Sequence, residues 1–164
     1  MKFIPVTNST KLAIVDDEDY KRVNNWNWYI TSYTKANKGR IVSGINGLII
    51  PLAQFVLGRP PEGKDLIDHI DRDPFNNQKS NLRFATRSQN QANRLHVTGN
   101  SGYRGVWFRK DSNNWRASIC VNGKTHGLGS FASREEAAEA YNLAAMKYFG
   151  EFAILNEIET KKDA

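Results

Sequence analysis

The adjacent residues Asn122 and Gly123 constrain the fold of this 164-residue chain more than any other local feature. An Asn-Gly pair favours the positive φ angles of a type I′ turn, whose twist matches that of two antiparallel strands. Apolar residues alternate with others through residues 114–121, which indicates a strand with one buried face. We therefore expect a hairpin from this strand and residues 124–131, with residues 103–109 forming a third strand.

An amphipathic helix is expected directly after this hairpin. Ser133 and Glu136 have the spacing of a capping box, in which each side chain satisfies a backbone N–H at the start of a helix. Gly150 is suited to the C-terminal end. The apolar residues between them fall on one stripe. They are Ala137, Ala138, Tyr141, Ala144, Ala145 and Tyr148. The pattern predicts three antiparallel strands packed on one helix.

Residues 1–58 indicate a smaller α+β unit. Trp26 and Trp28 have the same parity in a predicted strand, so they share one face, where core packing is their expected role. Pro51 suits the first turn of a helix that ends before Gly58. Further strands are expected at 11–15, 26–30 and 40–45, with a brief helix from Asp16 or Asp17 to Val23.

Residues 67–94 combine a strand, a polar loop, a second strand and a helix that opens with the capping box Thr86 and Gln89 and ends near His96. Asp68 and His69 lie on the first strand. A carboxylate, an imidazole and amides brought together by such a fold suit phosphodiester hydrolysis. Hard oxygen ligands hold Mg²⁺ beside phosphate, and a histidine takes a proton from water.

This stretch resembles the HNH family of nucleases, of the ββα-metal type found in phage and homing endonucleases, through DHID, NN, SNLR and QN. The resemblance implies that Asp68 and Asn90 bind one divalent metal ion, Mg²⁺ or alternatively Mn²⁺. It also implies that His69 is the general base and that Asn81, 12 residues further on, orients it. Upstream, many relatives carry a histidine and an arginine where this chain has PLAQF, with Gln54.

Residues 101–156 resemble the DNA-binding domain of plant Apetala-type, ethylene-response-factor-like proteins, through YRGV, W.A.I, LG.F, EEAA.AY and A.LN. Such domains lay a three-stranded sheet in the DNA major groove. The resemblance implies that Arg104 and Arg109 touch DNA and that Trp115 is the aromatic at the head of the second strand. Trp107 stands where plant proteins often have arginine, so base specificity does not transfer. The two arginines are five positions apart, so a regular strand sends them to opposite faces. Either a bulge or a strong twist brings them to one face, or only one of them reads DNA.

The positive charge of the chain is concentrated in one segment. Residues 83–116 carry seven Lys or Arg residues against one Asp, and the whole chain has a net charge of +6. Clustered arginines suit contact with phosphate, although a solvated basic surface is the alternative. The candidate DNA-binding residues are Arg83, Arg87, Arg94, Arg104, Trp107, Arg109, Trp115 and Arg116.

The predicted class is α+β, with a small N-terminal α+β unit leading into the ββα-metal motif, followed by the sheet and helix. The expected domains are a nuclease domain (1–96), a linker (97–100), a DNA-binding domain (101–156) and a tail (157–164).

The expected function is hydrolysis of double-stranded DNA by a monomer or weak dimer in the cytoplasm. A single cysteine, Cys120, excludes an internal disulfide, and the sequence lacks an apolar run that would span a membrane. Two alternatives stay open: a DNA-binding regulator whose nuclease motif is vestigial, and a protein that binds or cleaves RNA.

Overall fold

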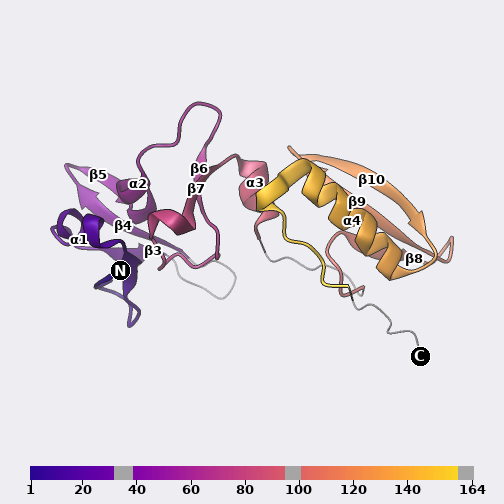
Figure 1. The fold of residues 1–164 in the computed structure, drawn as a ribbon, viewed down its shortest axis with the longest axis horizontal. Helices are drawn as coiled ribbons and strands as arrows, with labels where there is room; N and C mark the ends of the chain where they lie inside the picture. Colours follow the sequence, from indigo (N-terminus) through magenta and orange to yellow (C-terminus); the bar gives the residue numbers. More distant parts are fainter. Residues whose placement is uncertain (32–38, 95–100, 159–164) are drawn as a thin grey trace. The chain divides into compact units, whose positions relative to one another are not determined.

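The computed structural model describes residues 1–31, 39–94 and 101–158, and its contacts divide the chain into two units, Met1–Thr86 and Arg87–Ala164 (Figure 1). Each unit combines helices with antiparallel strands, which confirms the predicted α+β class. Within the described ranges, none of the helices has the length and apolarity that a membrane span requires.

The first unit contains a strand pair, a three-stranded antiparallel sheet in the order β3-β4-β5, and a separate two-stranded hairpin, β6–β7. Its strands are β1 (Lys2–Ile4), β2 (Ala13–Val15), β3 (Tyr29–Thr31), β4 (Arg40–Ile45), β5 (Leu48–Pro51), β6 (Leu66–His69) and β7 (Leu82–Ala85). Its helices are α1 (Asp17–Val23), α2 (Leu52–Leu57) and the 3₁₀ turn η1 (Lys79–Asn81).

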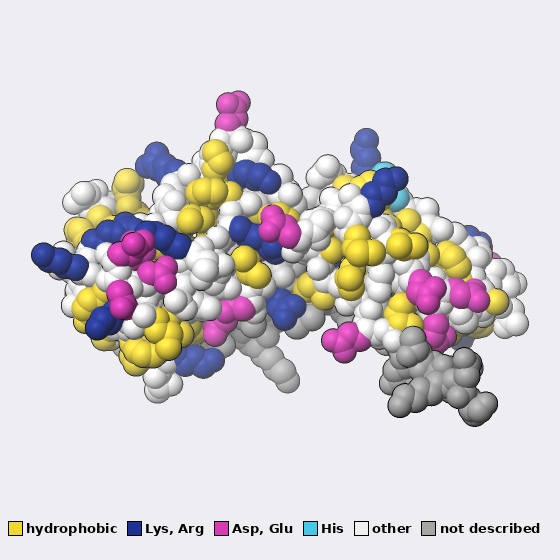
Figure 2. Space-filling view, in the orientation of Figure 1, with side chains coloured by type: hydrophobic (Ala, Val, Ile, Leu, Met, Phe, Trp, Pro, Cys, Tyr) yellow, Lys and Arg dark blue, Asp and Glu magenta, His cyan; other side chains and the backbone are white. Residues whose placement is uncertain are grey.

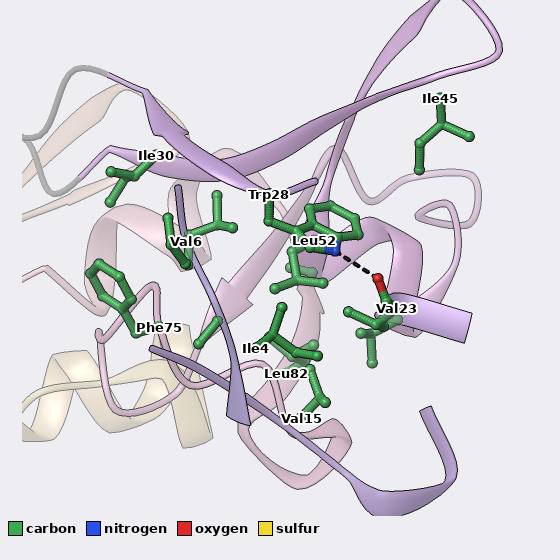
Figure 3. Close-up of a cluster of buried hydrophobic side chains, with 14 residues drawn as sticks. Ile4, Val6, Val15, Val23, Trp28, Ile30, Ile45, Leu52, Phe75 and Leu82 are labelled. Carbon is green, nitrogen blue, oxygen red and sulfur yellow. Dashed lines mark hydrogen bonds between the residues drawn. The ribbon is translucent and has the colours of Figure 1, made fainter. Parts of the chain in front are cut away.

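One hydrophobic core joins these elements. Trp28 is fully buried in it and donates its indole N–H to the carbonyl oxygen of Val23 at 2.9 Å (Figure 3). Trp26 packs against the same cluster, as its shared parity predicts. Phe75 and Leu82 contribute to this core, so the hairpin β6–β7 and its loop are built into the N-terminal unit.

The second unit places a three-stranded antiparallel sheet, in the order β10-β9-β8, on one long helix, as predicted. Its elements are α3 (Arg87–Ala92), β8 (Val106–Arg109), β9 (Asn114–Val121), β10 (Lys124–Phe131), α4 (Arg134–Phe149) and the 3₁₀ turn η2 (Gly150–Phe152).

The two local signals that predict this unit are confirmed. Asn122 and Gly123 have φ angles of 51° and 77°, as a type I′ turn requires. The hydroxyl of Ser133 accepts a hydrogen bond from the backbone N–H of Glu136 at 3.1 Å, which caps α4. The turn therefore sets the register of β9 and β10, and the cap sets where α4 begins.

The first strand of this sheet begins later than expected, at Val106. Gly105 has a φ of 71°, which interrupts the extended backbone. A side chain there would collide with Tyr141, since a Cβ would lie 2.2 Å from its ring. Arg104 therefore precedes β8, whereas Arg109 is its last residue. The two arginines do not lie on one regular strand, so the alternation of faces along a strand does not relate them and no bulge is required.

The division between the units also differs from the expected linker. It falls between Thr86 and Arg87, so α3 is grouped with the C-terminal sheet, whereas the sequence places this helix with the N-terminal motif. The expected linker, 97–100, and His96 lie outside the described residues.

Candidate functional site

Asp68 and His69 lie next to each other on β6, where antiparallel pairing sets their partners. Asp68 is opposite Arg83, and His69 is opposite Leu82. The carboxylate of Asp68 is only 4% exposed, and its Oδ2 accepts a hydrogen bond from Nε of Arg83 at 3.0 Å. Arg83 is itself largely buried, and its guanidinium fixes the Asp68 carboxylate. The contact of Arg83 with DNA stays a prediction.

His69 is held by the amide of Asn77, the second residue of the NN pair, to which the sequence alone assigns no role. Its Nε2 lies 3.2 Å from Oδ1 of the buried Asn77. The Asn77 Nδ2 donates to the carbonyl of Pro74 at 2.9 Å, so the amide oxygen faces the imidazole. An acceptor at this position requires Nε2 to carry the proton, and the neutral ring then has its lone pair on Nδ1.

The environment of His69 favours the neutral imidazole. Burial lowers the pKa of His69 below its ordinary value, although the hydrogen bond that His69 donates to Asn77 and the charges of Asp71, Asp68 and Asp73 oppose this shift. A histidine that is neutral near pH 7 is able to accept a proton from water.

Asn81 organises the loop between β6 and β7. Its Oδ1 accepts from the backbone N–H of Asp71 at 3.1 Å, and its Nδ2 donates to the Asp71 carboxylate at 2.9 Å and to the Asn76 carbonyl at 2.8 Å. The resemblance assigns Asn81 to orienting His69. The structure adds Asn77 as the hydrogen-bond partner of the imidazole, while the side chain of Asn81 closes the loop.

The N-terminal strands hold the segment that carries Asn77. The backbone of Ile14 bonds to Phe75 on one side, at 2.7 Å, and to Asn77 on the other, at 2.8 Å. The carboxylate of Asp16 accepts from the backbone N–H of Lys79 at 2.8 Å, and this bond lowers the pKa of Asp16. No local pattern predicts these contacts, because they join residues about sixty positions apart.

The two residues predicted to bind a metal ion both carry hard oxygen donors. Asp68 offers a carboxylate from β6, and Asn90 offers an amide from α3 in the second unit, where it is partly exposed. In the part of the chain that the structure describes, no three His, Cys, Asp or Glu residues cluster as a ligand set. One carboxylate with one amide suits Mg²⁺, which keeps several water ligands and shares its site with substrate phosphate.

A second candidate surface lies on the side of the sheet away from α4. Val106 and Ala117 point toward the helix and are buried, so their neighbours Trp107 and Arg116, which pair across β8 and β9, face outward. Trp107 is 42% exposed. The exposed side of α4, in contrast, carries hydrophobic and acidic side chains (Figure 2).

Three of the residues predicted to bind DNA have other surroundings. Trp115 packs toward the core and against Phe108 with ring centroids 5.1 Å apart, and its contact with DNA stays a prediction. Arg109 is exposed, and its guanidinium is bound to Asp111 at 2.7 Å. Arg104 donates to backbone carbonyls at the end of α3, at 2.7 to 3.2 Å. Arg87 and Arg94 are exposed at the two ends of α3.

Two family models match the chain. The model described as HNH endonuclease covers residues 52–92, and the model described as AP2 domain covers residues 101–151. The first match runs from α2 to α3, and the second covers the sheet and α4.

Individual relatives also resemble the chain, either over most of its length or over one part of it. An uncharacterized HNH endonuclease of Acanthamoeba polyphaga mimivirus is 36% identical over 90% of this chain and 75% of its own length. Protein 3.8 of Escherichia phage T7 is 34% identical over 53% of this chain and 72% of its own length. An AP2-like ethylene-responsive transcription factor of Arabidopsis thaliana is 45% identical, over 35% of this chain and only 12% of its own length. No solved structure matches.

The hydrogen bond between His69 and Asn77 can be tested through the pKa of the His69 imidazole. In the metal-free chain, the imidazole of His69 should titrate below the ordinary histidine value, because burial disfavours its charged form. Asn77→Asp should raise the pKa of His69, since a carboxylate beside Nε2 stabilises the imidazolium. NMR titration of the imidazole protons measures both values, and an unchanged pKa in Asn77→Asp would contradict the contact.

Proposed function

We propose that this chain, which belongs to the HNH endonuclease family and carries an AP2 domain, hydrolyses phosphodiester bonds of double-stranded DNA at a site containing Asp68, His69 and Asn90. The observation that carries the proposal is the hydrogen bond of His69 to Asn77, which leaves the lone pair of the neutral imidazole on Nδ1.

His69 is the general base in this proposal. Its Nδ1 takes a proton from a water molecule, the water oxygen attacks phosphorus, and the bond from phosphorus to the 3′ oxygen breaks. Asn77 holds the ring in the tautomer that this step requires. The lowered pKa of His69 favours the neutral imidazole, which is the form that accepts this proton.

Asp68 and Asn90 would hold one divalent ion, Mg²⁺ or Mn²⁺. Such an ion supplies positive charge for the scissile phosphate and for the departing 3′ oxygen. The assignment is supported by the hard oxygen donors of both residues and by the family match, which spans both positions at residues 52–92. Arg83 keeps the Asp68 carboxylate in one orientation, and this reduces the conformational entropy lost when an ion binds.

The outer face of the β8–β10 sheet is the DNA-binding surface in this proposal. Trp107 and Arg116 lie side by side on it, and Arg109 exchanges its partner Asp111 for phosphate when DNA binds. Arg116 has a buried Nε for which the structure shows no hydrogen-bond partner. Because one chain has one site, a monomer nicks one strand.

A plasmid-nicking assay tests the chemistry. The wild-type chain should nick DNA with Mg²⁺ and not with EDTA, and His69→Ala should lose cleavage by about 10²-fold or more. His126→Ala is the matched control, because His126 stacks on Tyr148 of α4 and takes no part in the proposed reaction. An RNA substrate is assayed in parallel. Preferential cleavage of RNA would mean that RNA, and not DNA, is the substrate. Wild-type rates in His69→Ala would remove His69 from the mechanism.

The salt dependence of DNA affinity tests the surface. Arg116→Gln should weaken binding and flatten the slope of log K against log salt by ~0.9 if Arg116 contacts one phosphate. Lys147→Gln also removes one cation, but from the end of α4, and should leave the slope unchanged. Fluorescence anisotropy in EDTA measures binding without cleavage. Equal slopes in both variants would mean that DNA lies elsewhere.

A further inference from the structure

We propose that Arg104 is a positioning residue of the nuclease, which holds the helix carrying Asn90 on the DNA-binding unit, and that it does not contact DNA. This inference rests on the proposed function for the role of Asn90. It also reverses what the resemblance implies for Arg104.

The guanidinium of Arg104 binds the C-terminal end of α3. Its Nη1 donates to the carbonyl oxygens of Ala92 at 2.8 Å and Arg94 at 2.7 Å, and its Nη2 donates to that of Gln91 at 3.2 Å. The last carbonyls of a helix have no partners within it, and they form the negative end of its dipole. One planar guanidinium binds the carbonyl oxygens of Ala92 and Arg94 and shares that of Gln91 with the N–H of Arg94, which the compact ammonium group of lysine is less suited to do.

The backbone of Arg104 is fixed as firmly as its side chain. Its N–H donates to Oδ1 of Asn156 at 2.7 Å, and its carbonyl accepts from Nδ2 of Asn156 at 3.2 Å. Asn156 in turn exchanges two hydrogen bonds with Asn142 of α4, at 2.7 and 2.9 Å. Arg104 therefore connects α3 to the main helix of the DNA-binding unit.

The sheet leaves room for α3 beside β9. Pairing with β8 reaches Ala117, and the N–H of Ser118 donates to Gly105, so β9 continues past the start of β8. Ser88, near the start of α3, accepts from the backbone N–H of Asn122 at 3.0 Å. A cavity of about 210 Å³ lies between α3 and this stretch of β9. The helix is thus held at both ends.

These contacts have a consequence for catalysis. Asn90 lies between Ser88 and Gln91, the positions through which α3 is attached to the second unit. The helix that supplies one of the two proposed metal ligands is therefore fixed within the second unit. Loss of the Arg104 contact should impair the reaction of bound DNA, while binding itself should be retained.

Two substitutions in the full-length chain separate these roles. Arg104→Lys keeps the positive charge and loses the planar guanidinium group, whereas Arg104→Gln loses both. Both should lower kcat for nicking by roughly 10- to 100-fold, as the loss of a residue that orients a metal ligand does. Both should also raise the Mg²⁺ concentration for half-maximal cleavage, with KM for DNA within about two-fold of wild type.

The salt dependence of DNA affinity, measured in EDTA, provides the second test. Arg116→Gln is the matched control, because it also removes one positive charge. Arg104→Gln should keep the wild-type salt slope. If Arg104 instead contacts phosphate, the slope should flatten by ~0.9, as expected for Arg116→Gln. A flattened slope in Arg104→Gln, or wild-type kcat in Arg104→Lys, would overturn the inference.

Hydrogen exchange provides a readout that does not depend on activity. Without metal or DNA, the amides of residues 87–94 should exchange faster in Arg104→Gln, while those of β9 should keep their protection. If the wild-type chain fails to nick DNA, the proposed function fails, yet exchange still decides whether Arg104 holds α3. Unchanged exchange at 87–94 would overturn the positioning role, even in an active enzyme.

Discussion

The β6–β7 hairpin determines the candidate site, and a two-stranded sheet is at best marginally stable in water. It depends on support from outside the hairpin. Leu82 and Phe75 anchor it in the N-terminal core, and the backbone of Ile14 bonds to the loop on both sides of Asn76. The N-terminal strands are therefore part of the framework of the candidate site, because they fix the loop from which Asn77 reaches His69.

Burial fixes the orientation of the polar side chains in this hairpin, and it makes the fold sensitive to their substitution. Asp68 and Arg83 form a largely buried pair, and removing one partner of such a pair typically costs about 3–5 kcal/mol. Asn77 and Asn81 are also buried, and both use their amides on the loop or the imidazole. Substitutions here combine loss of stability with loss of activity, so assays of Asp68 and Arg83 variants need a folding control.

Features governed by neighbouring residues could be predicted from the sequence. The Asn122–Gly123 turn, the Ser133 cap and the extent of β4 and β9 follow from local patterns. Strand 26–30 begins later, at Tyr29, because Trp26 still bonds to the turn after α1 through Val23.

Features governed by distant partners could not be predicted. Asn77 is a residue type that is common in loops, and only the folded loop places it at His69. The arginines at 83 and 104 add to a basic segment in the sequence, yet one binds a buried carboxylate and the other binds helix carbonyls. Charge counting alone does not separate such structural arginines from those, such as Arg116, that face outward.

In the proposed function, Asp68 and Asn90 bind the same metal ion. Titration of the full-length chain with Mn²⁺ in the presence of duplex DNA, followed by electron paramagnetic resonance, tests it most directly. We expect a single tightly bound ion per chain, whose binding is lost in Asp68→Ala and equally in Asn90→Ala. Wild-type Mn²⁺ binding in either variant, with the fold intact by circular dichroism, would contradict the claim.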